Sequence, residues 1–453
     1  MELKGKRVLV VGMGKSGLAA ARFLHGRGAV VTISDSRPAT VLSAEIEAML
    51  EAGVAVETGG HGLLTFRRQD LLVVSPGVPV DTPELQQTQA FGVPIIGEVE
   101  LASQFLRGKV LGITGSNGKT TTTTLLGEIL KHGGLAAQVG GNIGLPVVEM
   151  IDGITDDGWS VLELSSFQLE TIDTFAPKIA VVLNITPDHL DRHGTFENYA
   201  AAKTRITENQ TADDFLVLNA EDKPTQMVAA KTRAQIYWFS PRRPIKQGAF
   251  VHGESILFLP CEGGKAEPVM PVSEIPLVGV HNVENVLAAV CAARLAGVSA
   301  EKIREAVRAF KAVDHRLQFV AEINGVKYYN DSKATNVDAT AKALAAFDGN
   351  VRLILGGKDK GSDYTLLADL LKSRVACVYT IGAAAEKIES QLNGMVPIQS
   401  AKTLDAAVQR ASADASAGDV VLLAPACASF DQFTSYEHRG RTFVALVRAM
   451  EAK

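Results

Sequence analysis

Residues 112–121 have the sequence Gly-Ile-Thr-Gly-Ser-Asn-Gly-Lys-Thr-Thr, the most informative stretch of the chain. It overlaps the end of the apolar run Val110–Thr114 and opens a segment of helical period that ends at Gly133-Gly134. Glycines let backbone N–H groups turn toward an anion, and a helix N-terminus attracts it. In such a loop Lys119 reaches the β- and γ-phosphates and Thr120 ligates Mg²⁺. The pattern predicts a nucleoside triphosphate site rather than a chance glycine-rich turn.

Further apolar runs rich in Val, Ile and Leu alternate with longer segments of helical period. This alternation is typical of parallel sheets covered by helices. The runs are Val8–Val11, Leu71–Val74, Val110–Thr114, Ile179–Ile185, Val351–Leu355 and Val420–Ala424. The strand, glycine turn and helix pattern starts afresh at residues 8, 110 and 351, so we expect three α/β domains, at 1–97, 98–312 and 313–453. Residues 241–275 are rich in Pro, Gly and polar residues and predict hairpins or loops before a helix over Asn282–Ala296.

Composition restricts the class of protein. The chain has 453 residues, 46% hydrophobic and 21% charged, which excludes a disordered chain. A net charge of −5 argues against non-specific binding to nucleic acid or an anionic membrane. The four cysteines lie far apart and predict reduced thiols. No run approaches 18 apolar residues and the N-terminus has no apolar signal region, so we expect a soluble cytoplasmic protein.

A second glycine-rich turn lies near the N-terminus. Gly-Met-Gly-Lys-Ser-Gly at 12–17 follows the strand Arg7–Val11, and Asp35 closes the next strand. This is the pattern of a dinucleotide fingerprint, in which glycines allow a pyrophosphate to approach the backbone. It favours a ligand with a pyrophosphate, and any nucleoside diphosphate presents one.

Acidic and histidine residues follow two strands of the central part. Glu163 comes directly after the strand Ser160–Leu162, and its carboxylate is a suitable Mg²⁺ ligand. His189 follows the strand Ile179–Leu183, but by spacing alone it is typical of a loop histidine. Lys203, in a helical stretch, is by pattern an exposed surface lysine.

Three C-terminal loops carry polar residues at strand ends. They cover residues 330–336, 356–361 and 424–433. Their lysines and hydroxyl groups suit a small substrate with two carboxylates, and turns with helix caps are the structural alternative.

Together these motifs resemble the ATP-dependent Mur ligases of peptidoglycan synthesis over essentially the whole chain. Thr114–Thr121, Glu163–Gln168, Asn184–His189 and the Lys203 helix carry the general resemblance. Position 113 is Ile, as in the Mur-type loop rather than the full P-loop pattern. Residues 12–17, 331–336 and 429–433 narrow it to the D-glutamate-adding branch.

The resemblance implies an α/β protein with an N-terminal Rossmann-like domain, a central P-loop ATPase domain with a mainly parallel sheet, and a C-terminal Rossmann-like domain. It implies ATP-dependent addition of D-glutamate to UDP-N-acetylmuramoyl-L-alanine through an acyl phosphate. It also implies two Mg²⁺ ions, a carbamylated Lys203, and a monomer that binds neither nucleic acid nor membrane.

The resemblance also implies site residues, all named by their positions in this chain. The catalytic residues would be Lys119, Glu163, His189 and Lys203, and the metal ligands Thr120, Glu163, His189 and Lys203. ATP would contact Gly115, Ser116, Asn117, Gly118, Lys119, Thr120, Thr121, Asn282, Arg316 and Asp331, with Asn285 nearby. UDP-N-acetylmuramoyl-L-alanine would contact Gly14, Lys15, Ser16, Asp35, Ser36, Arg37, Ser75, Pro76, Gly77, Asn142, Ser165 and Gln168. D-glutamate would contact Lys333, Thr335, Lys360, Ser429, Phe430 and Tyr436.

Two other hypotheses remain at this point. A sister ligase of the same family would add a different amino acid to a muramoyl acceptor. A nicotinamide oxidoreductase or a nucleotide-binding protein with a vestigial ATPase loop would show no ATP turnover. Because an acyl phosphate must be shielded from water, we also expect a hinge near Ala312–Arg316.

Overall fold

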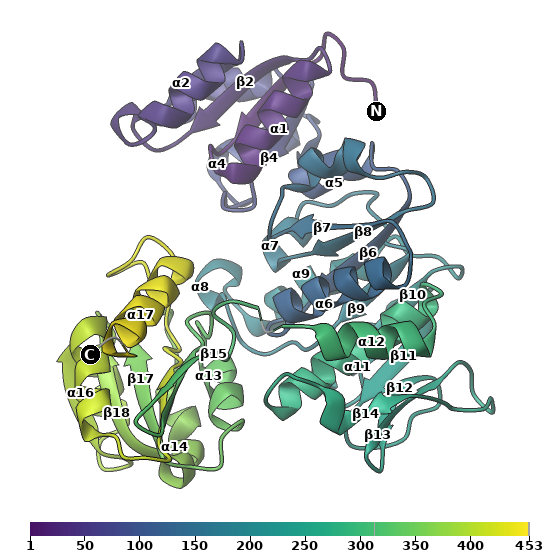
Figure 1. The fold of residues 1–453 in the computed structure, drawn as a ribbon. Coiled ribbons are helices and arrows are strands. Elements are labelled where there is room, and N and C mark those ends of the chain that lie inside the picture. The colour runs from purple at the N-terminus through teal and green to yellow at the C-terminus, as the bar shows by residue number, and fades with distance from the viewer. Residues whose placement is uncertain (312, 452–453) are drawn as a thin grey trace. The chain divides into compact units, whose positions relative to one another are not determined.

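The computed structural model describes residues 1–311 and 313–451 and contains three sheets built mainly of parallel strands (Figure 1). This is the three-domain α/β architecture that the sequence predicts. Ala312, which bounds the predicted central domain and hinge, lies outside the described residues. No helix among the described residues is long and apolar enough to cross a membrane.

The chain divides into two compact units. Unit 1 comprises Met1–Ile185, Glu197–Met270 and Leu287–Ala306. Unit 2 comprises Thr186–Phe196, Pro271–Val286 and Val307–Lys453. Unit 1 therefore holds the first two sheets, and unit 2 holds the third together with two segments from the middle of the chain.

The first sheet has the strand order β3-β2-β1-β4-β5, with every neighbouring pair parallel. The chain leaves β1 toward β2 on one side and returns on the other side at β4. Such a reversal of strand order opens a crevice at the carboxyl ends of the two strands. The strands are β1 (Arg7–Val11), β2 (Val30–Asp35), β3 (Ala55–Thr58), β4 (Leu71–Val74) and β5 (Ile95–Gly97). The helices are α1 (Lys15–Gly26), η1 (Ala39–Val41), α2 (Ser43–Glu51), α3 (Leu63–Arg67), α4 (Pro83–Ala90) and α5 (Glu98–Ser103).

The second sheet has the order β14-β13-β12-β11-β10-β9-β6-β8-β7. Strand β6 lies between β8 and β9, so the loops that follow these three strands meet at one edge. The strands are β6 (Lys109–Thr114), β7 (Ala137–Gly141), β8 (Trp159–Glu163), β9 (Ile179–Val182), β10 (Phe215–Asn219), β11 (Gln235–Ser240), β12 (Gly248–His252), β13 (Ser255–Leu259) and β14 (Glu267–Pro271). The helices between β6 and β11 are α6 (Lys119–His132), η2 (Val147–Gly153), α7 (Ser166–Leu169), α8 (Leu190–His193), α9 (Phe196–Thr204), η3 (Arg205–Thr207) and α10 (Lys223–Ala229), and η4 (Val272–Glu274), α11 (Val280–Leu295) and α12 (Ala300–Ala309) follow β14.

The third sheet has the order β15-β16-β20-β17-β18-β19. Only the β15–β16 hairpin is antiparallel among its described pairs. One apolar layer packs under α13 and α14 and another under α16 and α17, so helices cover both faces (Figure 1). The strands are β15 (Gln318–Ile323), β16 (Val326–Asn330), β17 (Val351–Gly356), β18 (Val375–Ile381), β19 (Ile398–Lys402) and β20 (Val420–Leu423). The helices are α13 (Val337–Leu344), η5 (Tyr364–Leu367), α14 (Ala368–Arg374), α15 (Ala385–Gln391), α16 (Leu404–Asp414) and α17 (Tyr436–Glu451).

The sequence-based elements agree with the structure to within a few residues. The predicted hairpin region contains the antiparallel pair β12–β13. The helix predicted to begin at Asn282 begins two residues earlier, at Val280. All four cysteines are free thiols, three of them buried.

Candidate functional site

The loop between β6 and α6 is shaped for an anion. Gly115 and Gly118 have φ values of 152° and 86°, which residues with a Cβ rarely adopt. Ser116 donates its backbone N–H to the Asn184 carbonyl at 2.9 Å, and Asn117 donates its own to the Asn184 side-chain oxygen at 2.9 Å. Asn184 follows β9, so the neighbouring strand fixes the loop directly in front of the α6 N-terminus.

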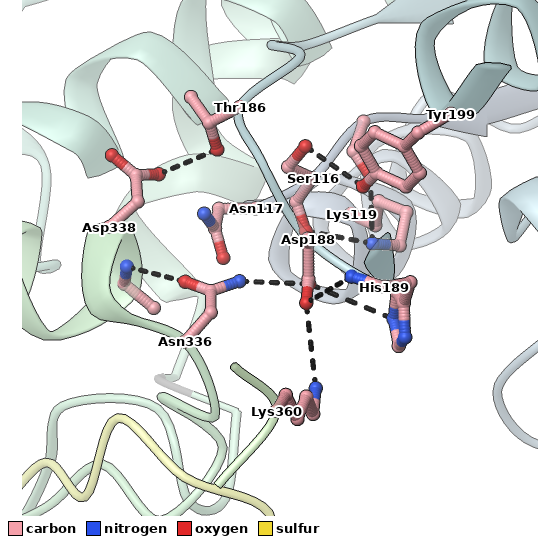
Figure 2. A network of polar contacts seen from close by, with 12 residues as sticks. Ser116, Asn117, Lys119, Thr186, Asp188, His189, Tyr199, Asn336, Asp338 and Lys360 are labelled. Carbon is pink, nitrogen blue, oxygen red and sulfur yellow. Dashed lines mark hydrogen bonds and ion pairs between the residues drawn. The ribbon is translucent and has the colours of Figure 1, made fainter. Parts of the chain in front are cut away.

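Two lysine ammonium groups converge on this loop. Lys119 donates to the Gly115 carbonyl at 2.8 Å, and Lys203 donates to the same oxygen at 2.8 Å. Lys203 is 1% exposed and lies over the Tyr199 ring at 4.8 Å. Tyr199 in turn shares a 2.9 Å hydrogen bond with Ser116 (Figure 2). The pattern-based expectation of an exposed Lys203 is therefore wrong, because α9 packs its last turn against the phosphate loop.

The Glu163 side chain lies beside that loop. It is the last residue of β8, pairs in register with Ile113 of β6, and is 1% exposed. Asn142 donates its side-chain N–H to Glu163 Oε1 at 2.8 Å and its backbone N–H to the Glu163 carbonyl at 2.9 Å. A single amide residue thus fixes both the backbone and the carboxylate of Glu163.

The residues present in unit 1 fit Mg²⁺ with a bound triphosphate. The loop glycines and α6 N-terminus form an anion cradle, and the Thr120 hydroxyl and Glu163 carboxylate are the oxygen donors that Mg²⁺ prefers. No group of three or more His, Cys, Asp or Glu side chains that could hold a metal ion occurs in the described part of the chain.

The N-terminal glycine turn is closely packed. A Cβ on Gly17 would lie 1.9 Å from the Gly12 carbonyl oxygen and 2.4 Å from Ser75 Oγ. Ser75 follows β4 and donates its hydroxyl to the Gly12 carbonyl at 2.9 Å. The turns after β1 and β4 are therefore joined where the strand order reverses, as a pyrophosphate site requires.

Asp35 and Arg37 form a second part of the same crevice. Arg37 donates to Asp35 from its backbone and from both Nε and Nη2, at 2.7–2.9 Å, and Met13 donates its N–H at 2.7 Å. Burial by itself would raise the pKa of Asp35, but these hydrogen bonds outweigh it and lower the pKa to about 2. The predicted residues Gly14, Ser16 and Ser36 belong to the same turns, and Pro76 and Gly77 follow Ser75.

Ser165 and Gln168 have a local structural role. Ser165 Oγ accepts the Gln168 N–H at 3.2 Å, and Gln168 Oε1 accepts the Ser165 N–H at 2.9 Å. These reciprocal bonds form a capping box that begins α7. Their predicted contact with a sugar–peptide ligand stays a prediction.

In unit 2, Lys333 and Tyr436 lie together. Lys333 donates to Tyr436 Oη at 3.0 Å and sits 4.6 Å from the ring centroid. Ser429 is 2% exposed, whereas Phe430 is 68% exposed. Thr335 lies in the loop that follows Lys333, so the structure brings part of the predicted D-glutamate set to one edge of the third sheet.

Arg439 of α17 organises this edge and was missed from the sequence. It is 1% exposed and donates to Ser332 Oγ at 3.0 Å, the Ser332 carbonyl at 2.8 Å and the Cys427 carbonyl at 3.1 Å. Burial lowers its pKa to about 10. The first residues of α17 include Glu437, His438 and Arg439, a polar run typical of an exposed helix end, so the sequence gives no indication that the guanidinium is buried.

Asp188 is a further residue that motif spacing left unassigned. Asn336 donates to Asp188 Oδ2 at 2.9 Å, and Lys360 Nζ lies 3.5 Å from Oδ1 (Figure 2). The neighbouring His189 Nε2 lies 3.7 Å from Oδ2. The Asp188 carboxylate thus lies near both Lys360, a predicted D-glutamate contact, and His189, a predicted metal ligand, all within unit 2.

The predicted adenine-side residues also gather in unit 2. Asn285 donates to Asn282 Oδ1 at 3.0 Å, and Asn282 donates to the Val278 carbonyl at 2.8 Å. Burial raises the pKa of Asp331 to about 7, and the Arg316 charge opposes that shift. The same Arg316 charge acts on His281, whose pKa burial lowers to about 4.

Comparisons with known proteins identify the family of the chain. Three family models match: the MurD-like N-terminal domain of Mur ligases at residues 6–97, the Mur ligase middle domain at 113–293, and the glutamate ligase domain of Mur ligases at 315–427. A protein of Acidobacterium capsulatum named UDP-N-acetylmuramoylalanine–D-glutamate ligase is 67% identical over 449 residues, covering 99% of this chain and 97% of that protein. The chain belongs to the Mur ligase family.

Two further Mur ligases extend the comparison. A protein of the same name from Koribacter versatilis is 59% identical and covers 99% of both chains. The structure of MurF ligase from Thermotoga maritima in complex with ADP has a TM-score of 0.60 at 18% identity, covering 99% of this chain and 96% of that one. The fold of this Mur ligase is therefore shared by members with little sequence in common.

Proposed function

We propose that this chain is an ATP-dependent ligase that joins D-glutamate to UDP-N-acetylmuramoyl-L-alanine, forming ADP and phosphate. The observation that carries the proposal is the 67% identity to a D-glutamate ligase over essentially both chains. It rests further on an ATP-type loop next to an acidic strand end and a lysine-containing edge in unit 2. A sister ligase with a different amino acid substrate is the alternative.

The chemistry requires activation, because a carboxylate is a poor electrophile for an amine at neutral pH. The acceptor carboxylate attacks the γ-phosphorus of ATP, the bond to the β-phosphate oxygen breaks, and ADP leaves. The D-glutamate amine then attacks the acyl phosphate carbon, and phosphate and one proton leave as the amide forms. Lys119 and the backbone N–H groups of the loop would hold the transferring phosphoryl group, whose charge repels the acceptor carboxylate.

Thr120 and Glu163 would hold a Mg²⁺ ion, and His189 with a carbamylated Lys203 would hold a second one. Bound Mg²⁺ would neutralise charge on the phosphates and on the acceptor carboxylate. The convergence of Lys119 and Lys203 on one carbonyl supports the carbamate. The buried Lys203 ammonium and the half-buried Lys119 ammonium would repel each other at this shared oxygen, whereas a carbamate on Lys203 is an anion and an oxygen ligand.

The remaining predicted contacts divide between the two organic substrates. The turns at Gly14–Ser16, Asp35–Arg37 and Ser75–Gly77 would bind the UDP part, and Asn142, Ser165 and Gln168 the sugar–lactyl–alanine part. Lys333 and Lys360 would pair with the two carboxylates of D-glutamate, beside Thr335, Ser429, Phe430 and Tyr436.

Several organisational features are part of the same proposal. The domain bounds would be 1–97, 98–312 and 313–453, supported by one sheet in each range. The enzyme would act as a monomer in the cytoplasm, where ATP and nucleotide-linked sugars are supplied. A hinge near 312–316 would let substrates enter and then exclude water from the acyl phosphate.

The test is product identification by mass spectrometry. The enzyme is incubated with Mg-ATP, UDP-N-acetylmuramoyl-L-alanine and, separately, D-glutamate, L-glutamate, L-alanine or a diamino acid. We expect an acceptor heavier by one dehydrated glutamate in the D-glutamate reaction alone. An adduct with another amino acid only would favour the sister ligase, and no adduct with any of them would contradict the ligase assignment.

A further inference from the structure

We propose that residues 140–148, here called the linking segment, couple the pyrophosphate site of the first sheet to the Mg²⁺ ligand Glu163. Lys15 and Glu98 would be the positioning residues that anchor the segment, Lys15 at Gly144 in its middle and Glu98 at Val148, its last residue. The inference rests on the proposed function only in taking the first site to bind a nucleoside diphosphate and the second to bind Mg²⁺ with a nucleotide. All residues involved lie in unit 1.

Lys15 anchors the first half of the linking segment. It follows Gly14 in the glycine turn after β1, and its Nζ donates to the Gly144 carbonyl at 2.5 Å. An ammonium group carries three donors, so Lys15 can hold Gly144 and a pyrophosphate oxygen at once. A diphosphate in the glycine turn would therefore strengthen the link from this turn to Gly144 rather than replace it.

Glu98 anchors the second half. It is the first residue of α5, which follows the last strand of the first sheet, and it is 2% exposed. Its Oε1 accepts the Val148 N–H at 2.8 Å, and the Val147 N–H also interacts with the carboxyl group. These two N–H groups open η2, where a short helix leaves donors without partners inside the helix. The carboxylate thus ties the end of the linking segment to the helix that follows the first sheet.

Asn142 connects the segment to the metal side. It lies two residues before Gly144 and donates to both the Glu163 carboxylate and the Glu163 backbone carbonyl. Gly141 allows this approach, since a Cβ there would lie 2.4 Å from the Glu163 carbonyl oxygen. Any shift of the segment therefore moves the amide that sets the rotation of the Glu163 carboxylate.

The consequence is a coupling between two binding sites. A diphosphate bound at the glycine turn would fix Lys15, the linking segment and Asn142, so that Glu163 is already oriented when Mg²⁺ and nucleotide arrive. Thermodynamic linkage requires the reverse effect to have the same size. Acceptor binding would in this way favour nucleotide binding before any chemistry occurs.

The experiment measures the dissociation constant of Mg-ADP by calorimetry, with and without saturating UDP. In the wild-type enzyme we expect UDP to tighten Mg-ADP binding at least about fivefold, the lower end of ordinary coupling between two sites. Lys15→Met and Glu98→Met should reduce this ratio to within about twofold of one, even at UDP concentrations raised to saturation. Glu98→Gln, which keeps an oxygen acceptor for the Val148 N–H, should restore it.

Glu100→Met is the matched control. Glu100 lies on the same helix and is 1% exposed, but it accepts the N–H groups of Asp173 and Phe175 instead of the linking segment. This variant should keep the wild-type ratio, although it loses a buried carboxylate as Glu98→Met does.

Three results would overturn the inference: a wild-type ratio of one, a wild-type ratio in either anchor variant, or equal loss in Glu100→Met. The Lys15 side chain is exposed, so Lys15→Met decides the matter if Glu98→Met does not fold. A failed ligase assay with an intact Mg-ADP and UDP coupling would contradict the proposed function and leave this inference standing.

Discussion

Among single residues, Lys203 differs most from what its sequence pattern predicts, because the pattern is that of a surface lysine. It is buried against the phosphate loop and shares the Gly115 carbonyl with Lys119. We expect Lys203→Ala to lower the turnover rate about 100-fold, because the proposed second Mg²⁺ ion loses one of its protein ligands. Acetate or another short carboxylic acid should restore part of the activity by supplying the missing oxygens.

The matched control for this measurement is Lys178→Ala. Lys178 lies at the opposite end of the sheet, before β9, and pairs with Asp214 at 3.3 Å. This variant should keep its turnover rate and show no response to acetate. Wild-type turnover in Lys203→Ala without added acid would contradict the carbamate.

Two buried glutamates of α5, Glu98 and Glu100, have pKa values shifted in opposite directions, so we expect their substitution to change stability in opposite directions. Burial raises the pKa of Glu98 to about 7, despite opposing hydrogen bonds from Val148 and Val147, and the Glu149 charge adds to the rise. For Glu100, burial also raises the pKa, but hydrogen bonds from residues 173–175 outweigh it and leave the pKa below its ordinary value.

A raised carboxyl pKa means that the folded state binds more protons than the unfolded state between about pH 4.5 and 7. Glu98 therefore costs stability as pH rises through this window, on the order of 3 kcal/mol in total. Relative to wild type, Glu98→Gln should gain stability between pH 5 and pH 8. Glu100→Gln should instead lose stability, because its carboxylate is stabilised above the unfolded pKa.

Urea unfolding followed by tryptophan fluorescence measures both variants, since Trp159 and Trp238 lie in unit 1. Parallel pH profiles for Glu98→Gln and wild type would show that folding does not raise the pKa of Glu98, which would contradict this prediction.

At the scale of elements, the glycine turn before α1 depends on the close approach of Gly17 to Gly12 and Ser75. Gly17→Ala should destabilise unit 1 by about 1–3 kcal/mol through overpacking and weaken UDP binding more than tenfold. Gly26→Ala, at the end of the same helix, meets nothing within 4 Å and should bind UDP as wild type does. Calorimetric titration with UDP compares the two, and equal affinities would contradict the placement of the pyrophosphate at this turn.

Arg439 makes a corresponding prediction for the third sheet. It joins the loop after β16 to the loop after β20 from the first turn of α17. Arg439→Gln should destabilise unit 2 by on the order of 3 kcal/mol and raise the KM for D-glutamate. The KM for the UDP-linked acceptor should change little, because its predicted contacts lie in unit 1. A rise in both KM values by the same factor in steady-state assays would contradict a role confined to these loops.

The strands and helices were predicted correctly where a run of apolar residues is followed by a glycine-containing turn. Buried parallel strands such as β4 and β6 are apolar on both faces, and each is followed by a glycine-containing turn. The β15–β16 hairpin was not predicted, although Asn324-Gly325 between its strands, both with positive φ, is a typical hairpin turn. The parallel pairing of β16 with β20, about 90 residues later in the chain, leaves no local signal.

The candidate site was predictable to the extent that motifs are local. The phosphate loop follows β6 directly and Glu163 is the last residue of β8, so their meeting at one sheet edge could be inferred. Tyr199, Asn184 and Arg439 act through contacts with residues far away in the chain, and nothing in their neighbouring sequence indicates those partners. The buried state of Lys203 belongs to the same class.

At the scale of the whole molecule, three sheets each place glycine or hydroxyl-rich turns at carboxyl strand ends, and each sheet reverses its strand order there. Three such edges suit an enzyme that must bind a nucleoside diphosphate, a nucleoside triphosphate and an amino acid. Family membership and the extended identity to D-glutamate ligases agree with this division.

In the proposed reaction, ATP activates the acceptor carboxylate for attack by D-glutamate. The most direct measurement is phosphate release from Mg-ATP with UDP-N-acetylmuramoyl-L-alanine that carries ¹⁸O in its carboxylate. We predict release that requires both the acceptor and D-glutamate, with one ¹⁸O atom transferred to each phosphate. Release without the acceptor, or phosphate free of ¹⁸O, would contradict the account.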